Sequence, residues 1–219
     1  MDKSTTQAFF FHDFENSYIP HILKEVYMDR IYHEYLNGKK DLVIMDVGAN
    51  IGLTSYYFSQ YAKTVYALEP SKQHLKAFLK MKQFNGLDNV DIVPCALSTE
   101  DGKTKFFHNT NNTMFSLSNV VNGEGESEEV KTITLETLLK EKNIAEVDLM
   151  KLDVEGFESK LLTHDSFRSG LSKIKLIIGE WHQWTDMNPH QFKACFEDLR
   201  FSFKWLNRTE ASIFIAELR

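Results

Sequence analysis

Short apolar runs alternate with segments of helical periodicity along most of the chain. The runs are LVIMDV at 42–47, TVYALE at 64–69, VDIVPCAL at 90–97, VDLMKLD at 147–153 and KIKLIIGE at 173–180. Strands that are apolar throughout are typical of a parallel sheet with helices on both faces, because neither face of such a strand then meets water. The alternation therefore predicts an α/β fold built on a mostly parallel sheet.

Helix signals fall between and after these runs. In the segment 71–86, four residues stand at helical spacing: Leu75, Phe78, Leu79 and Lys82. Gly86 is placed to end that helix in a left-handed turn. Thr134 is a typical N-cap for a short helix, and Asn188 followed by a proline is typical of another helix start.

The C-terminal segment alternates in the manner of a β-hairpin. FSFKWLN (201–207) and SIFIAEL (212–218) are separated by the polar turn RTEA, a pattern that predicts two antiparallel strands. Ligands of open α/β sheets bind at the carboxyl ends of the strands, where the strand order reverses. Residues that directly follow the strands are therefore the first candidates for a functional site.

The first predicted strand runs into the glycine-punctuated turn DVGANIG at 46–52. In the dinucleotide fingerprint G-x-G-x-x-G, the second glycine lets the backbone approach a pyrophosphate. Asn50 stands at that position here, which favours an uncharged or zwitterionic group instead, and Asp46 suits an amine-bearing ligand. We expect Gly48 to leave space for the ligand, so that Gly48→Val abolishes binding without unfolding the sheet.

The second predicted strand ends in an acid. Glu69 can accept hydrogen bonds from both ribose hydroxyls of an adenosine, a property that NAD and S-adenosylmethionine sites share. The preceding loop separates the two cofactors, because S-adenosylmethionine carries no phosphate but has one amino-acid moiety and one ribose. The sequence therefore predicts S-adenosylmethionine as the cofactor.

The sequence resembles the class I S-adenosylmethionine-dependent methyltransferases and, more narrowly, the FkbM family. The resemblance is carried by DVGANIG (46–52), ALEPS (67–71), VPCALS (93–98), KTITLETLL (131–139), KLDVEGFE (151–158) and IIGEWH (177–182). It implies a Rossmann-like sheet of seven mostly parallel strands with helices on both faces and an antiparallel C-terminal strand. It also implies methyl transfer, usually to a hydroxyl oxygen of a small molecule, a sugar or a lipid-linked glycan.

The resemblance further implies which residues bind the cofactor. Those expected to frame its methionine and ribose moieties are Asp46, Gly48, Asn50 and Gly52. Glu69 is expected to hold the ribose hydroxyls with Pro70 and Ser71 beside it. Those expected to border the adenine are Cys95, Ala96 and Leu97.

Acid and base candidates follow the fourth and fifth strands. His182, which titrates near neutrality, ranks first as the general base, with Asp153 and Glu180 as the other catalytic candidates. Asp153 is also a candidate for the cofactor's amine, and Glu155 for a cap on the following helix. Magnesium held by Asp153, Glu155 and Glu180 was weighed, but the DVEG pattern lacks a dedicated octahedral ligand set and we predict no metal.

Composition limits the partners. The formal charge is −6, from 25 basic and 31 acidic residues, without a Lys/Arg-rich run, so we expect no nucleic-acid partner. No apolar run approaches the roughly 18 residues of a membrane span. We expect reduced Cys95 and Cys195, a cytoplasmic protein and a small-molecule or glycan substrate.

Two domains of unequal size are expected. Residues 1–40 read as a helical N-terminal appendage and candidate substrate lid, and residues 41–219 as the methyltransferase domain. Substrate choice is expected to depend on the appendage and on the segment 108–129. Two other functions stay open: a nicotinamide-dependent oxidoreductase on a similar sheet, and a cofactor-binding module without catalysis.

Overall fold

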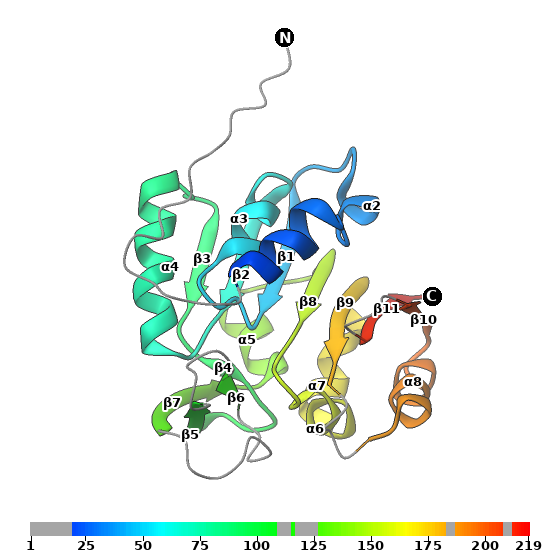
Figure 1. The fold of residues 1–219 in the computed structure, drawn as a ribbon. Coiled ribbons are helices and arrows are strands. Elements are labelled where there is room, and N and C mark those ends of the chain that lie inside the picture. The colour runs from blue at the N-terminus through cyan, green and yellow to red at the C-terminus, as the bar shows by residue number, and fades with distance from the viewer. Residues whose placement is uncertain (1–18, 109–114, 117–126, 183–186, 208–211) are drawn as a thin grey trace.

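A computed structural model describes residues 19–108, 115–116, 127–182, 187–207 and 212–219. Its main sheet has the order β10-β11-β9-β8-β1-β2-β3 (Figure 1). The strands are β1 (Leu42–Val47), β2 (Ala62–Leu68), β3 (Val90–Val93), β8 (Leu149–Leu152), β9 (Leu176–Trp181), β10 (Phe201–Asn207) and β11 (Ser212–Leu218). All pairs from β9 to β3 are parallel, and β11 is antiparallel to both of its neighbours. The predicted seven-stranded fold is confirmed.

Helices cover both faces of this sheet. They are α1 (Ile19–Leu23), the π-helical turn η1 (Lys24–Met28), α2 (His33–Leu36), α3 (Leu53–Ser59), α4 (Lys72–Asn85), α5 (Leu135–Glu141), α6 (Glu158–Thr163), α7 (Asp165–Arg168), the 3₁₀ turn η2 (Ser169–Lys173) and α8 (Pro189–Glu197). Neighbouring residues of β1 point to opposite faces: Ile44 belongs to the buried cluster that holds Phe58 of α3, and Met45 to the one that holds Leu161 of α6. This two-sided burial explains why the strands are apolar throughout.

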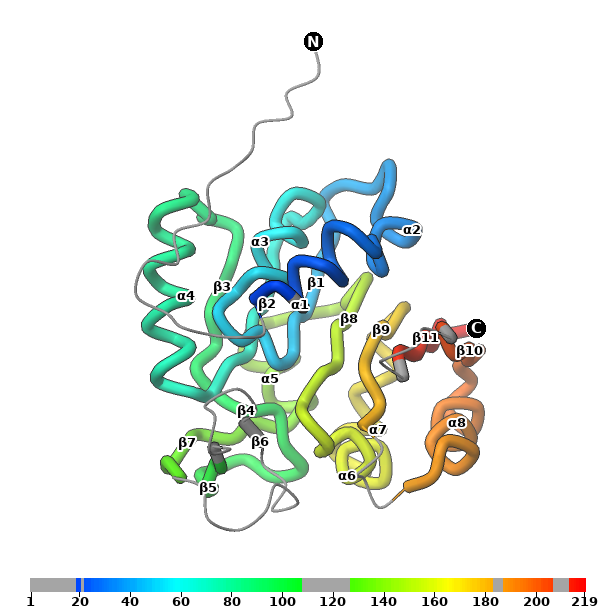
Figure 2. Tube along the Cα trace, viewed as in Figure 1, coloured from blue at the N-terminus to red at the C-terminus, as the bar shows by residue number. Residues whose placement is uncertain are grey.

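A second, smaller sheet was not predicted, although KTKFFHN and EVKTITL within it have the pattern of strands. Its order is β4-β7-β5-β6, from β4 (Ala96–Leu97), β7 (Ser127–Ile133), β5 (Gly102–His108) and β6 (Phe115–Ser116). The run 90–97, predicted as one strand, divides at Pro94 into β3 and β4, because proline cannot donate a hydrogen bond to a neighbouring strand. Figure 2 shows that the chain leaves the main sheet after β3 and that the small sheet lies beyond its carboxyl edge.

The helix α4 begins and ends as predicted, but it buries a different face. Ser71 caps its first turn and Gly86 follows it in a left-handed conformation, with φ of +61°. The buried residues are His74, Phe78 and Met81, whereas Leu79 is 56% exposed. Phe78 is shared by the predicted apolar positions and the observed buried ones. Because the buried positions are 74, 78 and 81, Leu79 lies beside the buried face of the helix and not on it.

The helices α5 and α8 confirm their predicted caps. The Thr134 side chain accepts a hydrogen bond from the backbone of Thr137. The Asn188 side chain accepts from Gln191, and the Gln191 side chain accepts in return from the Asn188 backbone. These reciprocal bonds satisfy backbone donors that a helix start leaves without partners.

The N-terminal helices belong to the main core. The described part of the predicted helical appendage forms α1, η1 and α2, and Val26, Tyr32 and Leu36 pack in the same buried cluster as β1 and α3. Residues 1–18 of the appendage and most of the segment 108–129, on which substrate choice was expected to depend, lie outside the described residues. Among the described residues, no helix has the length and apolar composition that crossing a bilayer requires.

Candidate functional site

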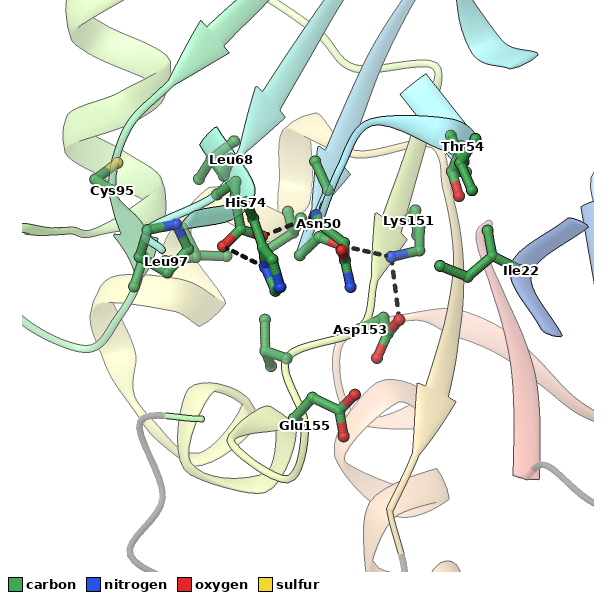
Figure 3. A pocket seen from close by; sticks show the side chains of 18 of the residues that line it. Ile22, Asn50, Thr54, Leu68, His74, Cys95, Leu97, Lys151, Asp153 and Glu155 are labelled. Carbon is green, nitrogen blue, oxygen red and sulfur yellow. Dashed lines mark hydrogen bonds and ion pairs between the residues drawn. The ribbon is translucent and has the colours of Figure 1, made fainter. Parts of the chain in front are cut away.

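A pocket opens at the carboxyl ends of β1, β2 and β8. It encloses about 890 Å³, part of it open to solvent, and the small sheet forms one of its walls. The N-terminal helices contribute Glu25 and Tyr32 to the lining, and the loop after β8 contributes Asp153 and Glu155. Figure 3 shows side chains from these distant segments facing a common space. The pocket therefore lies where the fold of the sheet predicts a ligand.

The loop after β1 owes its glycines to protein contacts. Gly48, Asn50 and Gly52 all have positive φ, of +81°, +52° and +89°. A Cβ on Gly48 would stand 1.8 Å from the carbonyl oxygen of Asp153, and one on Gly52 would meet the ring of Phe78 at 2.3 Å. The expectation for Gly48→Val is therefore corrected: the added side chain collides with the end of β8 and disturbs the sheet itself.

Glu69 is fixed in one orientation at the end of β2. One of its oxygens accepts from the backbone N–H of Asn50 at 2.8 Å. The other accepts from the backbone N–H of Ser71 at 2.8 Å and lies 3.3 Å from Nδ1 of His74. An ionised carboxylate has about four acceptor positions, so Glu69 retains capacity for a ligand hydroxyl beside these contacts.

A buried lysine joins the first loop to the end of β8. Lys151 donates to the carbonyl oxygen of Gly48 at 3.0 Å and pairs with Asp153 at 3.1 Å and Asp46 at 3.7 Å. Burial alone lowers the pKa of Lys151, but the charges of Asp153 and Asp46 outweigh it and raise that pKa. The Lys151 ammonium is therefore a fixed positive charge beneath the pocket, and Asp46 also accepts from Ser55 at 2.6 Å.

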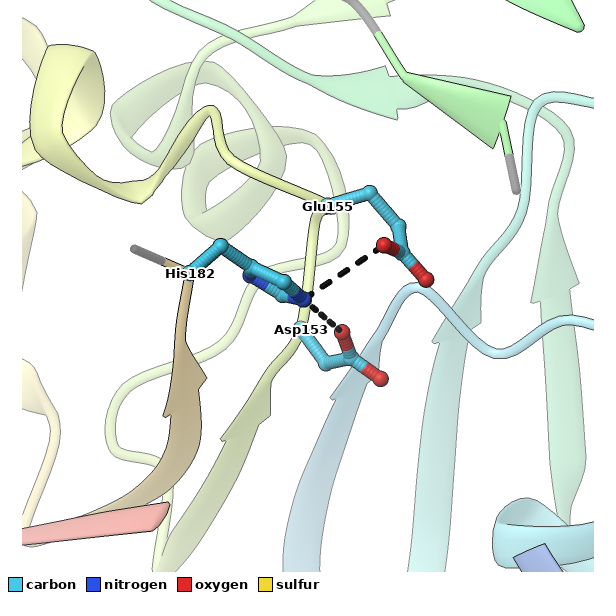
Figure 4. A group of neighbouring side chains, drawn as sticks. All are labelled: Asp153, Glu155 and His182. Atoms are coloured by element: carbon cyan, nitrogen blue, oxygen red, sulfur yellow. Dashed lines mark ion pairs between the residues drawn. The ribbon is translucent and has the colours of Figure 1, made fainter. Parts of the chain in front are cut away.

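His182 is buried near three carboxylates, two of which, from Asp153 and Glu155, are drawn with it in Figure 4. Its Nδ1 is 2.9 Å from Oε1 of Glu158, and its Nε2 is 3.4 Å from Glu155 and 3.9 Å from Asp153. Burial lowers the pKa of His182, but the hydrogen bond and charge of Glu158, with Asp153 and Glu155, outweigh it and raise the pKa to about 10. An imidazolium cannot accept a proton, so this geometry disfavours His182 as a general base.

Two acids in this region, Glu155 and Glu180, are destabilised in their charged forms. Burial, followed by the charge of Asp153, raises the pKa of Glu155 to about 8 and that of Glu180 to about 7. Glu155 also has a left-handed backbone, with φ of +53°. Glu180 lines a smaller adjoining cavity of about 280 Å³, together with Glu25, Tyr32 and Asp153.

Most of the predicted cofactor residues line the larger pocket. They are Gly48, Asn50, Glu69, Pro70, Cys95, Ala96, Leu97 and Asp153. Asp46, Gly52 and Ser71 were predicted with them but lie behind the wall: Asp46 pairs with Lys151, Gly52 packs on α4 and Ser71 caps that helix.

Other lining residues escaped the sequence analysis. Lys151 and His74 are among them. Lys151 could have been found, because a basic residue within the apolar run VDLMKLD is unusual. Nothing in the local sequence distinguishes His74. Cys95 is a wall residue, and burial raises the pKa of its thiol to about 12, so this thiol is not a reactive group.

The charged side chains that line the pocket indicate which cofactor it can bind. Among the described lining residues, the carboxyl groups of Glu25, Glu69, Asp153 and Glu155 stand against Lys151 and His74, with Glu155 largely protonated at pH 7 because its pKa is raised to about 8. Lys151 is already paired with Asp46 and Asp153. Such a wall attracts a sulfonium and an ammonium group and disfavours a pyrophosphate. The residues present therefore fit an adenosyl sulfonium cofactor.

Comparison with known proteins agrees with this geometry. A family model described as the methyltransferase FkbM domain matches residues 46–203. The solved structure of methyltransferase FkbM from Methylobacillus flagellatus KT has a TM-score of 0.57 at 13% identity, and the match covers 85% of this chain but 46% of that one. No curated protein matches the sequence.

Two further solved structures share the fold along most of their length. A putative methyltransferase from Streptococcus mutans in complex with SAH has a TM-score of 0.52 at 12% identity, covering 87% of this chain and 97% of that one. A precorrin-6y C5,15-methyltransferase from Geobacter metallireducens GS-15 has a TM-score of 0.51 at 15% identity, covering 86% and 87%. These likenesses establish a common fold.

Proposed function

The chain belongs to the FkbM methyltransferase family, and from that premise we propose that it methylates a hydroxyl oxygen of a small molecule, sugar or lipid-linked glycan. Its cofactor is S-adenosylmethionine, which supplies an activated methyl group on a sulfonium sulfur. The observation that carries the proposal is the acidic pocket at the strand ends, whose lysine is already paired within the protein.

The wall residues receive the following roles in this proposal. Glu69 accepts from the ribose hydroxyls, since its carboxylate is held toward the pocket by backbone donors. Cys95, Ala96 and Leu97 border the adenine. Asp153 has one oxygen on Lys151 and the other 3.9 Å from Nε2 of His182, and we assign this carboxylate, as a lining group, to the acceptor side or to the cofactor's ammonium group.

The adjoining cavity supports a hydroxyl-bearing acceptor. Glu25, Asp153 and Glu180 line it, and their carboxyl oxygens can accept hydrogen bonds from the hydroxyls of an acceptor. Several hydroxyls on one molecule, as in a sugar, would satisfy such a wall. Orientation of the acceptor oxygen toward the sulfonium contributes up to about 7–11 kcal/mol to catalysis.

A base contributes less than orientation does, on the order of 10²–10⁴-fold. Of the three catalytic residues that the sequence suggested, we keep Asp153 and Glu180 as proton acceptors. Both line the adjoining cavity, whereas His182 lies behind Asp153 and Glu155 with acidic groups at both ring nitrogens. His182 is therefore proposed to order these carboxylates.

Titration calorimetry with S-adenosylhomocysteine and with NADH tests the cofactor site. We expect saturable binding of S-adenosylhomocysteine, weakened about 10-fold or more in Glu69→Gln because the new amide must place a donor against a backbone donor. The exposed Glu136→Gln on α5 is the matched control and should bind normally. Preferential binding of NADH would favour the oxidoreductase alternative and contradict the proposal.

Turnover is tested separately with methyl-labelled S-adenosylmethionine. The labelled cofactor is offered with hydroxylated small molecules, free sugars and lipid-linked glycans, and products are analysed by mass spectrometry. A methyl ether on one of these acceptors is the expected product. Tight cofactor binding without transfer to any of the three classes, or methylation on nitrogen, would contradict the O-methylation proposal.

A further inference from the structure

Asp153, Glu155 and His182 bring three metal-ligating atoms into one place. One atom from each side chain lies within 4.8 Å of the others, and Figure 4 shows the three groups converging from the loop after β8 and the end of β9. We propose that these side chains form a binding site for a first-row divalent transition metal. The sequence predicted no metal, and the ligand set it suggested for magnesium held Glu180 in place of His182.

Separations within the cluster are too long for direct hydrogen bonds and equal to or somewhat longer than those between two ligands of one ion. Nε2 of His182 is 3.4 Å from Glu155 and 3.9 Å from Asp153, longer than the roughly 2.7–3.0 Å typical of charge-assisted N–H···O bonds. Two donors bound at about 2.1 Å to one metal lie roughly 3.0–3.4 Å apart in octahedral or tetrahedral geometry. Small side-chain rotations would therefore complete the site.

Glu158 supplies independent support from outside the ligand set. It is fully buried, and its Oε1 accepts from the backbone N–H groups of Val154 and Gly156 at 3.0 and 3.3 Å. The same oxygen lies 2.9 Å from Nδ1 of His182, so Nδ1 must be the donor. That bond turns Nε2 toward Asp153 and Glu155, as in the carboxylate–histidine pairs that orient metal ligands, and a bound ion would take the place of the proton on Nε2.

The donor set indicates the class of cation. One imidazole nitrogen and two carboxylates suit ions such as Mn²⁺ or Zn²⁺, whereas Mg²⁺ and Ca²⁺ prefer oxygen ligands. Asp153 and Glu155 also line the pocket, so the remaining coordination positions face the space where an acceptor oxygen would bind. That last step rests on the proposed function, but the metal site does not.

The test uses the tag-free full chain after treatment with a chelator. Calorimetric titration with Mn²⁺ and with Zn²⁺ should show one saturable site for at least one ion, and that ion should raise the thermal midpoint. Glu155→Gln should abolish the binding. The orienting residue is tested by Glu158→Gln, which should weaken the binding by about 10–100-fold. Circular dichroism verifies that each variant is folded.

Glu180→Gln is the control, because it makes the same chemical change on a neighbouring half-buried acid outside the ligand set. We expect it to bind the metal within about threefold of the parent chain, a difference below 1 kcal/mol. Three outcomes would overturn the inference: an equal loss of metal affinity in Glu155→Gln and Glu180→Gln, an unchanged metal affinity in Glu158→Gln, or no saturable binding by the parent chain.

Calorimetry with S-adenosylhomocysteine on the same samples separates the two proposals. A chain that binds S-adenosylhomocysteine but neither ion removes the metal site and leaves the proposed function standing. A chain that binds the ion but not S-adenosylhomocysteine removes the proposed function and leaves the metal site.

Discussion

Lys151 connects the two halves of the site through a single side chain. It holds the Gly48 carbonyl on one side and the Asp153 carboxylate on the other, above the fully buried Asp46. A charge in such a place is tolerated because it is compensated, and removing one partner leaves the other uncompensated in a medium of low polarity. The geometry of the cofactor loop therefore depends on this ammonium group.

Lys151→Met should lower the free energy of unfolding by about 3–5 kcal/mol, because the Asp46 charge loses its buried partner. Lys175→Met is the comparison: Lys175 also pairs with two carboxylates, but its side chain is 52% exposed, and exposed pairs contribute at most about 1 kcal/mol. Urea denaturation followed by circular dichroism measures both. Equal losses would show that burial does not set the strength of the Lys151 pairs.

Residues at strand ends could be predicted, and residues that act through others could not. Glu69 and Asp153 directly follow apolar runs, so their position in the pocket follows from the rule for parallel sheets. Glu158 was within a recognised motif but resembled an ordinary residue of a helix start. Its contact with His182 joins residues 24 positions apart, and no local pattern reports such a pair.

At the scale of elements, a helix or strand could be predicted where the contacts that determine it are local in the sequence. Strand β1 has the predicted bounds because its apolar run and the following glycine both act locally. The small sheet was missed for two reasons. Strand β5 pairs with β7 across twenty or more residues of the chain, a separation that no local pattern reports. The apolar run also continues across Pro94 and hides the boundary between β3 and β4. The cap of α5 was found from Thr134, but its partner Asp101 was not.

Asp101 links the small sheet to the start of α5. Its carboxylate accepts from the Thr137 hydroxyl and from the Thr134 backbone N–H, both at 2.6 Å. These bonds, the Thr137 bond foremost, lower the pKa of Asp101. A lowered folded-state pKa stabilises the protein above the unfolded value of about 3.9, and that contribution is lost as the pH falls through the folded value.

Asp101→Asn should therefore destabilise the chain by about 1 kcal/mol at pH 7, since Asp101 is exposed and its bonds are partly screened. The deficit should shrink below about pH 4, where the parent carboxylate becomes protonated. Unfolding free energies at the two pH values measure the difference, with the exposed Asp88→Asn as the reference. A deficit that is constant with pH would contradict an ionic contribution.

At the scale of the whole molecule, the N-terminal helices complete the core on one face of the sheet. Val26, Tyr32 and Leu36 are buried beside α3 and β1, and Glu25 and Tyr32 reach the pocket from the same segment. The sequence suggested an appendage at 1–40, because apolar periodicity marks a helix but does not name the surface it covers. The lining of the pocket is therefore coupled to core packing.

Leu36→Ala measures that coupling. Leu36 is 1% exposed, so the substitution should cost about 2–5 kcal/mol, as deletion of a core side chain does. Met28→Ala in the same segment removes a side chain that is 77% exposed and should cost less than about 0.5 kcal/mol. Chemical denaturation followed by a probe in the main sheet would show the destabilisation of Leu36→Ala as a shift of the global unfolding transition. An unshifted global transition in Leu36→Ala would instead mean that the N-terminal helices unfold independently and act as a separate lid.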